Sequence, residues 1–399
     1  MRIFPKINPV KGILISTINS EKKKKDLVLI QIDNGSQTVG VFTNSKTPSE
    51  PIKWSKRNIN NKIRGIFANS GNANALTGKD GEKDIKNYLQ PLSKLLDCKP
   101  KNILVASTGV IGKRLNLKNI KKSIPKLYKK SKKKCCSWRS FSESIMTTDT
   151  FPKAASKKIK IGNKIITISG VAKGSGMIHP NMGTMLAFIF TDAEIPRKIL
   201  KQTLINGVND SFNSITVDGD TSTSDTVFLT STGKTEHKKI TSVNNAHYKN
   251  FIKAFNDLLL DLAIQIVKDG EGAKKIIKIN ISNAANKKMA KKIGFSIANS
   301  MLVKTFLGSK ELNFGRLYMA IGKSMENINP EKISITFGDI LIIKNGRIVH
   351  NLKEDKIKKY MLKKELFLKI NLNSGKNSTN IYTCDLTHKY VTINTNYLT

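Results

Sequence analysis

The sequence contains few cysteines, and this shortage narrows the classes of protein to which it can belong. Its 399 residues include four cysteines, and none of them forms a C-x-x-C pair. Cys135 and Cys136 are adjacent, which is an unfavourable arrangement for a disulfide. The cysteines therefore predict a reducing compartment and a protein without a metal site.

Long apolar runs are also missing. The amino-terminal residues MRIFPKINPVKGILIS lack the apolar core of a signal peptide. No segment approaches the roughly 18 apolar residues that a membrane span needs. With 39% hydrophobic residues over 399 positions, the composition indicates a soluble globular protein with one large α/β domain or two domains sharing an interface. We expect it to be cytoplasmic, with no membrane partner.

Acidic residues are scarce, since 29 Asp and Glu stand against 69 Lys and Arg, giving a net charge of +40. Such a surplus suggests nucleic-acid binding. The excess is nearly all lysine, however, and arginine is the usual reader of bases and phosphates. The lysines are dispersed, with short runs at 22–25, 129–134 and 353–364. We interpret them as solvated surface and expect no specific nucleic-acid partner; a DNA-binding protein, recognised by salt-sensitive binding, is the alternative.

Short β-branched segments alternate with helical patterns, which predicts layered sheets and helices of the α/β class. The expected strands are 27–33, 38–43, 64–71, 102–108, 164–172, 184–192, 226–232 and 335–343. The clearest helix ends at Gly270, and its apolar face consists of Phe251, Phe255, Leu258, Leu259, Leu262 and Ile266.

Three weaker patterns complete the expected fold. Residues 286–306 predict one helix packed through Ile293, Ile297 and Met301. Residues 113–139 predict a pair of surface helices broken at Pro125. The carboxyl-terminal residues 381–399 alternate as a strand does.

The stretch GVAKGSGMIHPNMGTMLAFIFTDA, residues 170–193, combines a glycine-rich segment with a buried strand pattern. A nucleotide-binding loop would need G-x-x-x-x-G-K-[ST] or G-x-G-x-x-G. Neither spacing is present, because Lys173 precedes the glycines. The stretch therefore predicts a glycine-rich loop of another kind.

Gly183 and Thr184 lie where this loop meets the apolar strand. Glycine leaves its carbonyl open, and attack by the Thr184 hydroxyl on that carbonyl would give an ester. Hydrolysis would then free an amino-terminal threonine, which carries its own base because an α-amine titrates near 8. Threonine is also a favoured strand residue, so the residues alone leave a nucleophile and an ordinary strand residue both open.

Eight further motifs accompany this stretch along the chain. They are GVFTNS (40–45), ANSGNANALTGKDG (68–81), VASTGVIG (105–112), ESIMTTDTFPK (143–153), DSFNSITVDGDTSTSDT (210–226), VKDGEGAKK (267–275), SMLVKTFLGSKELNFGR (300–316) and CDLTHKYVTINTNYLT (384–399). Together they resemble the bifunctional ornithine acetyltransferase/glutamate N-acetyltransferase family of arginine biosynthesis, the ArgJ family. The resemblance extends over nearly the whole chain and in the family's order.

The resemblance implies a DmpA/ArgJ-like layered α/β fold and a precursor that cuts itself between Gly183 and Thr184. The products would be an α chain (1–183) and a β chain (184–399), intertwined and paired as an α2β2 heterotetramer. The implied reaction moves acetyl from N-acetylornithine to glutamate through acetyl-threonine, without a metal or prosthetic group, and acetyl-CoA is an optional co-substrate. A monofunctional ornithine acetyltransferase and a same-fold self-processing aminopeptidase or amidase are the alternatives.

The resemblance also implies roles for individual residues. Thr184 would be the nucleophile, and Thr108 and Gly109 would form the oxyanion hole. The substrate-binding residues would be Thr147, Lys173, Thr184, Glu271, Asn394 and Thr399, with Glu271 reading the substrate's α-amino group. The ordinary alternatives are a strand-ending turn for Thr108 and Gly109, a helix cap for Thr147, and a solvated lysine for Lys173. Gly183 departs from the alanine that is commoner in the family, so we expect slower processing.

Overall fold

The computed structural model describes residues 3–20, 26–133, 137–179, 185–238, 240, 242–309 and 311–396. The chain divides into two compact units. The first contains Met1–Asn213, Asp220–Ile266 and Thr399, and the second contains Ser214–Gly219 and Val267–Leu398. The predicted cut between Gly183 and Thr184 lies outside the described residues.

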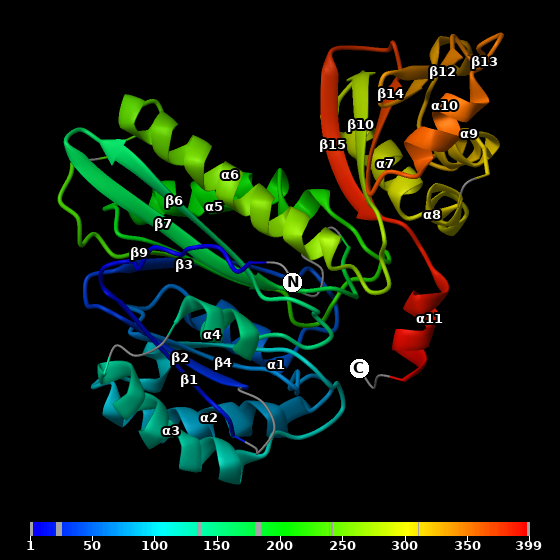
Figure 1. The fold of residues 1–399 in the computed structure, drawn as a ribbon. Helices are drawn as coiled ribbons and strands as arrows, with labels where there is room; N and C mark the ends of the chain where they lie inside the picture. Colours follow the sequence, from blue (N-terminus) through cyan, green and yellow to red (C-terminus); the bar gives the residue numbers. More distant parts are fainter. Residues whose placement is uncertain are drawn as a thin grey trace. The chain divides into compact units, whose positions relative to one another are not determined.

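Two sheets form the centre of the first unit (Figure 1). The four-stranded sheet has the order β1-β2-β4-β5, with β1 (Ile13–Ile18), β2 (Leu27–Ile32), β4 (Gly65–Asn69) and β5 (Ile103–Ser107). The five-stranded sheet has the order β3-β9-β8-β7-β6, with β3 (Gln37–Phe42), β9 (Thr226–Ser231), β8 (Leu186–Thr191), β7 (Lys164–Lys173) and β6 (Lys153–Ile161). The pair β8–β9 is parallel, and β7–β8 is antiparallel.

Helices cover the outer faces of these sheets, so the first unit has four layers (Figure 1). The helices of the unit are α1 (Glu50–Asn58), α2 (Gly78–Leu95), α3 (Leu117–Lys132), α4 (Trp138–Ser144), α5 (Arg197–Asn209) and α6 (Ala246–Lys268), with η1 (Pro100–Asn102) and η2 (Phe212–Ser214). Helices α2 and α3 pack on the four-stranded sheet through residues such as Leu89 and Leu127. Helices α5 and α6 lie on the five-stranded sheet (Figure 1).

A hydrophobic core joins the two sheets face to face. Its members include Ile30 and Ile66 from one sheet, Phe188 and Phe228 from the other, and Phe141 from α4. All five side chains are fully buried. Burial of a side chain of this size contributes about 1.5–3 kcal/mol. Strand β8 is buried at every residue, so the segment that follows Thr184 is anchored in the middle of the unit.

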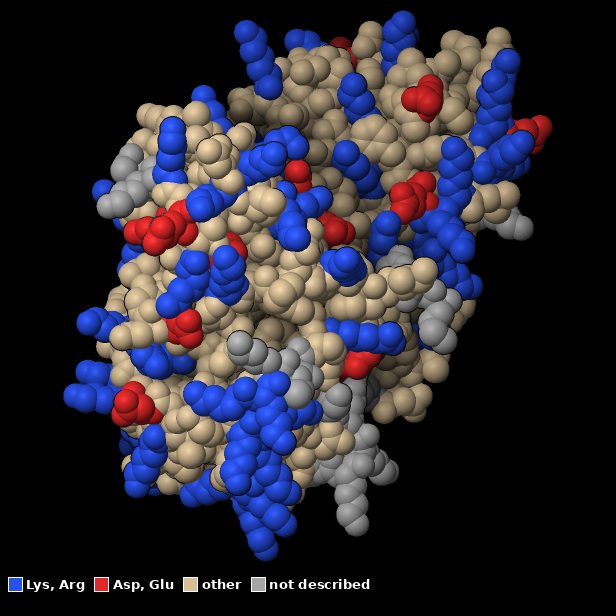
Figure 2. All heavy atoms as spheres, turned by 60° about the vertical axis from the view of Figure 1, so that its left-hand side comes forward, with Lys and Arg blue, Asp and Glu red and all other residues tan. Residues whose placement is uncertain are grey.

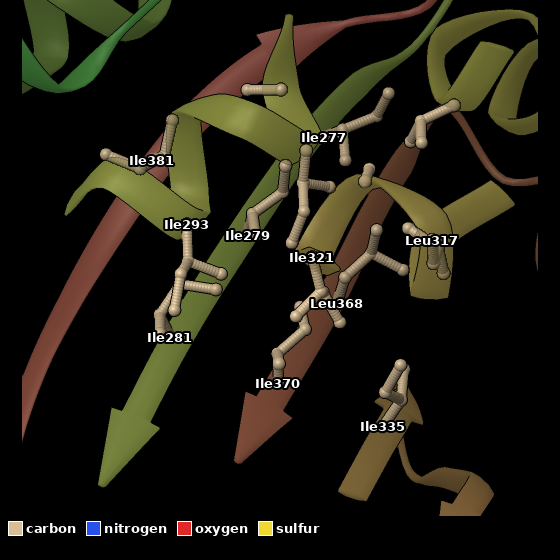
Figure 3. Close-up of a cluster of buried hydrophobic side chains, with 14 of the residues drawn as sticks. Ile277, Ile279, Ile281, Ile293, Leu317, Ile321, Ile335, Leu368, Ile370 and Ile381 are labelled. Atoms are coloured by element: carbon tan, nitrogen blue, oxygen red, sulfur yellow. The ribbon is translucent and has the colours of Figure 1, made fainter. Parts of the chain in front are cut away.

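The second unit contains one mixed sheet of six strands in the order β13-β12-β11-β14-β10-β15. The strands are β10 (Ile276–Ala284), β11 (Ser334–Phe337), β12 (Ile340–Lys344), β13 (Arg347–Ile348), β14 (Glu365–Asn371) and β15 (Asn377–Cys384). Its helices are α7 (Lys287–Ala298), α8 (Met301–Gly308), α9 (Gly315–Gly322), α10 (Glu354–Met361), α11 (His388–Thr395) and the short η3 (Pro330–Lys332). Figure 3 shows Ile293 of α7 and Ile321 of α9 against Ile281 and Ile370 of the sheet.

The sequence-based strands and the long helix before Gly270 are largely confirmed, but two predicted elements differ. The expected strand 335–343 is a hairpin, because Gly338 has a φ of +56° and turns the chain between β11 and β12. The expected helix 286–306 is two helices, α7 and α8. Asn299 follows α7, and the Ser300 side chain accepts a hydrogen bond from Val303 N as the amino-terminal cap of α8. Met301 is consequently 72% exposed rather than packed.

Two further expectations are wrong. Helix α3 runs through Pro125 without interruption. Pro125 lies on its exposed side, where water can satisfy the carbonyl that loses its partner. The expected carboxyl-terminal strand ends at Cys384, and His388–Thr395 forms α11, capped by Thr387. Helix α11 has no buried residue. The alternation of apolar and polar residues in this segment therefore does not reflect the burial of one face.

The lysine surplus lies on the surface, as expected. Figure 2 shows basic side chains spread over the visible face, with far fewer acidic ones among them. On α3 the exposed lysines include Lys118, Lys122, Lys126 and Lys129. No helix among the described residues is long and apolar enough to span a membrane.

Candidate active site

The ends of three adjacent strands lie side by side at one end of the five-stranded sheet. Lys173, the last residue of β7, pairs with Leu186, the first residue of β8. Leu186 also pairs with Thr226, the first residue of β9. Thr184 and Gly183 lie outside the described residues. Thr184 is nevertheless covalently joined to Met185, which directly precedes Leu186 at the start of β8. The candidate site is therefore built around the edge at which β8 begins.

Lys173 brings together two threonines that lie far away in the sequence. Its Nζ donates hydrogen bonds to Thr108 Oγ1 at 3.1 Å and to Thr147 Oγ1 at 2.9 Å. Thr108 directly follows β5, and Thr147 lies in the segment after α4. Lys173 is only 2% exposed, which contradicts the ordinary reading of this residue as a solvated lysine. Burying an ammonium group is costly unless it is hydrogen-bonded, so these contacts compensate for the burial.

The turn at Thr108 and Gly109 packs tightly against the loop after β4. Gly109 has a φ of +129°, and a Cβ there would approach Gly71 C to 2.3 Å. Only glycine fits such a conformation and such a close approach. Thr108 N donates to Asn69 O at 3.1 Å, so its amide is already engaged. Among the described residues Gly109 N makes no backbone hydrogen bond. The donors this turn can offer are therefore the Thr108 hydroxyl and the Gly109 amide.

The Asp149 carboxylate holds the two loops of the site together. Its Oδ1 accepts hydrogen bonds from Lys153 Nζ at 2.6 Å and from Gly174 N at 2.7 Å. Its Oδ2 accepts a hydrogen bond from Thr147 N at 3.0 Å. Gly174 follows Lys173 in the chain, so one carboxylate fixes the backbone beside both partners of the Lys173–Thr147 contact.

Asp149 and Lys153 form an ion pair whose two side chains are completely buried. Burial alone would raise the pKa of the Asp149 carboxyl. The positive charges of Lys153 and Lys173, together with the hydrogen bonds from Lys153 and Thr147, hold that pKa well below its ordinary value instead. Asp149 is therefore a carboxylate at neutral pH. A buried pair of this kind adds little to stability compared with apolar residues, which points to a positioning role.

A second buried carboxyl, Asp225, lies at the start of β9. Its Oδ1 accepts a hydrogen bond from Met185 N at 2.7 Å. Burial raises the pKa of this carboxyl well above its ordinary value, and the Met185 hydrogen bond and the Lys173 charge oppose the shift only in part. The Thr43 hydroxyl, which also lowers this pKa, donates to Ser222 O at 2.8 Å. Within the described part of the chain, Asp225 Oδ2 has no hydrogen-bond partner.

The second unit brings Glu271 and Asn394 together. Asn394 Nδ2, on α11, donates to Glu271 Oε2 at 2.8 Å. Glu271 lies in the turn that follows α6, as the sequence predicted, and is 9% exposed. Thr387 Oγ1 donates to Gly272 O at 2.7 Å, and a Cβ on Gly272 would approach Tyr390 N to 2.5 Å. The turn and α11 therefore pack closely and place the two predicted side chains in contact. Thr399 lies outside the described residues.

The sequence reasoning did not identify Asp149, Lys153 and Asp225. For the first two a signal was available, because an aspartate lies four residues before Lys153, the lysine that begins the buried start of β6. For Asp225 the segment TSTSDT gives no comparable signal, since serine, threonine and aspartate are typical of loops. The described residues contain no group of three or more His, Cys, Asp or Glu placed to hold a metal ion.

The layered sheets and the buried lysine–threonine cluster define the class of this protein. It is an α/β protein in which two packed sheets are covered by helices on their outer faces, with a polar site at the strand ends. The ArgJ family model matches residues 14–399. The arginine biosynthesis bifunctional protein ArgJ of Bradyrhizobium diazoefficiens is 40% identical over 99% of this chain and 97% of its own. The protein of the same name from Gluconobacter oxydans is 38% identical over 99% of this chain and 94% of its own. The chain belongs to the ArgJ family.

A solved structure agrees with this assignment. The crystal structure of the arginine biosynthesis bifunctional protein ArgJ of Bacillus halodurans matches with a TM-score of 0.50 and 36% identity. The match covers 98% of that chain but 53% of this one. The crystallised chain is therefore roughly half as long as the polypeptide described here.

Replacing Asp149 tests the buried ion pair. In Asp149→Asn the Lys153 ammonium stays buried without its counter-charge, and we expect a loss of about 3–5 kcal/mol in the free energy of unfolding. Urea denaturation measures this loss. The matched control, Asp149→Asn with Lys153→Met, removes both charges and should recover part of the stability. Equal stability of Asp149→Asn and wild type would contradict the role given to the pair.

Proposed function

We propose that this protein is an acetyltransferase of arginine biosynthesis that moves the acetyl group of N-acetylornithine to glutamate. The observation that carries the proposal is the buried Lys173–Thr108–Thr147 cluster, beside the start of β8, in a member of the ArgJ family. The relatives' name, bifunctional protein ArgJ, supports two activities: glutamate N-acetyltransferase, and amino-acid N-acetyltransferase with acetyl-CoA as donor.

The proposed reaction has two half-reactions. The Thr184 hydroxyl attacks the acetyl carbonyl of N-acetylornithine, and its proton passes to the α-amine of Thr184. Ornithine leaves and acetyl-threonine remains. The amine of glutamate then attacks this ester and leaves as N-acetylglutamate. The Thr108 hydroxyl and the Gly109 amide stabilise the oxyanion in both steps; loss of one such donor costs roughly 3 kcal/mol of transition-state stabilisation.

The binding roles follow from charge and position. Lys173 is a buried cation, which suits a carboxylate or a developing negative charge, and Thr147 lies within hydrogen-bond distance of its ammonium. Glu271, held by Asn394, binds a substrate amino group, and Thr399 contributes at the carboxyl terminus. The reaction requires no metal or prosthetic group. The protein acts in the cytoplasm, without a specific nucleic-acid partner.

Thr184 must first be freed by a cut after Gly183, which divides the precursor into chains 1–183 and 184–399. Two observations support this. The crystallised relative has a chain of roughly half this length. The five-stranded sheet also takes β3, β6 and β7 from one product and β8 and β9 from the other, so the products would remain joined by hydrogen bonds. Pairing of two such units gives the proposed α2β2 heterotetramer.

An enzymatic assay tests the function directly. Purified protein with N-acetylornithine and glutamate should produce ornithine and N-acetylglutamate, which chromatography of the products detects. With acetyl-CoA in place of N-acetylornithine, N-acetylglutamate should again form, as expected for two activities. Release of acetate without N-acetylglutamate would indicate a hydrolase and contradict the proposal.

Denaturing gels test the cut. Wild type should run as two bands, because the peptide bond before Thr184 is broken, whereas Thr184→Ala lacks the attacking hydroxyl and should run as one. Gly183→Ala is the matched comparison and should be processed faster, since alanine restrains the backbone more than glycine does. A fully active wild-type protein that runs as a single full-length band would show that cleavage is not required.

Replacing Glu271 tests substrate binding. Glu271→Ala removes the carboxylate but no group from the cleavage site, so the two-band pattern should persist. The KM values for N-acetylornithine and glutamate should rise about tenfold or more, as expected for a lost charge-assisted hydrogen bond. Glu311→Ala, at an exposed glutamate of the same unit, is the control. Unchanged KM values in Glu271→Ala would remove Glu271 from the site.

A further inference from the structure

Asp225 has an unusual environment for a buried carboxyl. It lies one residue before β9, is fully buried, and is oriented so that Oδ1 accepts the Met185 amide proton. In the described part of the chain, Oδ2 has no hydrogen-bond partner; the Thr43 hydroxyl is near enough to this carboxyl to lower its pKa, but it donates to Ser222 O. Buried polar atoms without a partner are rare, and an unpaired one costs free energy. The arrangement therefore suggests that the partner of Oδ2 belongs to a later state of the protein.

Covalent geometry identifies the group that can become this partner. Met185 N is bonded to the carbonyl carbon of Thr184, so the backbone nitrogen of Thr184 is three bonds away. Bond lengths of about 1.3–1.5 Å keep the two nitrogens within about 3.7 Å of each other in any conformation. Asp225 Oδ1 is 2.7 Å from Met185 N. Cleavage would convert the nitrogen of Thr184 from an amide into an amine, and would do so close to this carboxyl.

We propose that Asp225 is a positioning residue for the α-amino group that cleavage creates at Thr184, with Oδ2 as its hydrogen-bond acceptor. This inference rests on the cleavage proposed above. Asp225 would complete a chain of three groups, in which a nucleophile is served by a base and the base is oriented by a third group. Asp225 would hold the amine from one side while its other oxygen fixes the Met185 amide.

The movement of the proton and electrons during acetyl transfer shows what Asp225 would do. When the Thr184 hydroxyl oxygen bonds to the acetyl carbon, the carbonyl electron pair moves onto oxygen and the hydroxyl proton moves to the amine. The resulting ammonium donates a hydrogen bond to Asp225 Oδ2. When the intermediate collapses, the bond to the ornithine nitrogen breaks and the same proton passes to that nitrogen. Asp225 itself gains and loses nothing over the cycle.

The burial of Asp225 suits this task. An exposed aspartate would be fully ionised and would hold the amine as ammonium, which cannot accept a proton. Burial raises the pKa of the Asp225 carboxyl, with Lys173 on β7 as the opposing charge. A carboxyl that ionises less readily stabilises the ammonium form of its neighbour less, so the amine is more available as a base.

The simplest test is the structure of the cut enzyme. A crystal structure of wild-type protein after processing should place the Thr184 nitrogen within about 3.2 Å of Asp225 Oδ2, the limit of a good hydrogen bond. A separation above about 4.5 Å would overturn the inference. A wild-type chain that transfers acetyl without any cut would instead contradict the proposed cleavage on which the inference rests, and a cut chain that makes no N-acetylglutamate would contradict the proposed function, so the failures are distinguishable.

A stability cycle tests the coupling between carboxyl and amine. In the uncut Thr184→Ala background, Asp225→Asn removes a carboxyl whose pKa is raised by burial, so the melting temperature at pH 7 should rise. The sign follows from linkage: a raised folded-state pKa destabilises above the unfolded value near 3.9, so the rise should vanish at pH 3. In the cut background the same change removes the partner of the amine, and the melting temperature should fall. Equal shifts in both backgrounds would overturn the inference.

Asp192 provides a matched control at the other end of β8. It is also buried, but both of its oxygens are occupied, by Thr167 N at 2.7 Å and Thr235 Oγ1 at 3.0 Å. Asp192→Asn should shift the melting temperature alike in both backgrounds. Cut Asp225→Asn should lose about a hundredfold in kcat with KM unchanged, whereas Asp192→Asn should keep its kcat. If Asp225→Asn is cut and keeps wild-type kcat, Asp225 has only a structural role.

Discussion

The buried carboxylate of Asp149 is the interaction on which the candidate site depends. It joins the loop after α4 to the end of β7 through hydrogen bonds from Thr147 N, Gly174 N and Lys153 Nζ. Without it, the amides of Thr147 and Gly174 would lose the acceptor that they share, and Lys173, held by β7, would face a Thr147 whose backbone is less well fixed. Apolar residues could fill the same space at similar stability, so the retained charge pair is best understood as fixing geometry.

The first unit therefore contains two buried carboxyls with opposite behaviour, and the charge of Lys173 lowers the pKa of both. Asp149 is paired with a lysine and stays ionised, whereas Asp225 has one backbone donor and a strongly raised pKa. The difference follows from their partners rather than from their burial, which is similar. Placing two titratable groups in contrasting environments is a common way of dividing tasks within an active site.

Much of the fold could be predicted from the sequence, because buried strands such as β8 and the apolar face of α6 leave clear patterns. The errors fall where local chemistry outweighs the pattern: Gly338 turns one strand into a hairpin, Ser300 caps a new helix, and α11 has no buried face to report. Lys173, Thr108 and Thr147 were named through resemblance, and their contact required the folded chain. Asp225 could not be found in the sequence, since its role depends on which amide it meets.

The interleaved order of the five-stranded sheet has a consequence for how the protein can be renatured. Strands β8 and β9 follow the proposed cut, while their neighbours β7 and β3 precede it. An intact precursor folds as one molecule, with every strand tethered to the next. After the cut, the same sheet would have to be rebuilt from two separate polypeptides, so recovery from denaturation would become a second-order process that depends on concentration. The stability of the mature enzyme would then be kinetic: it would depend on a slow rate of unfolding rather than on a reversible folding equilibrium.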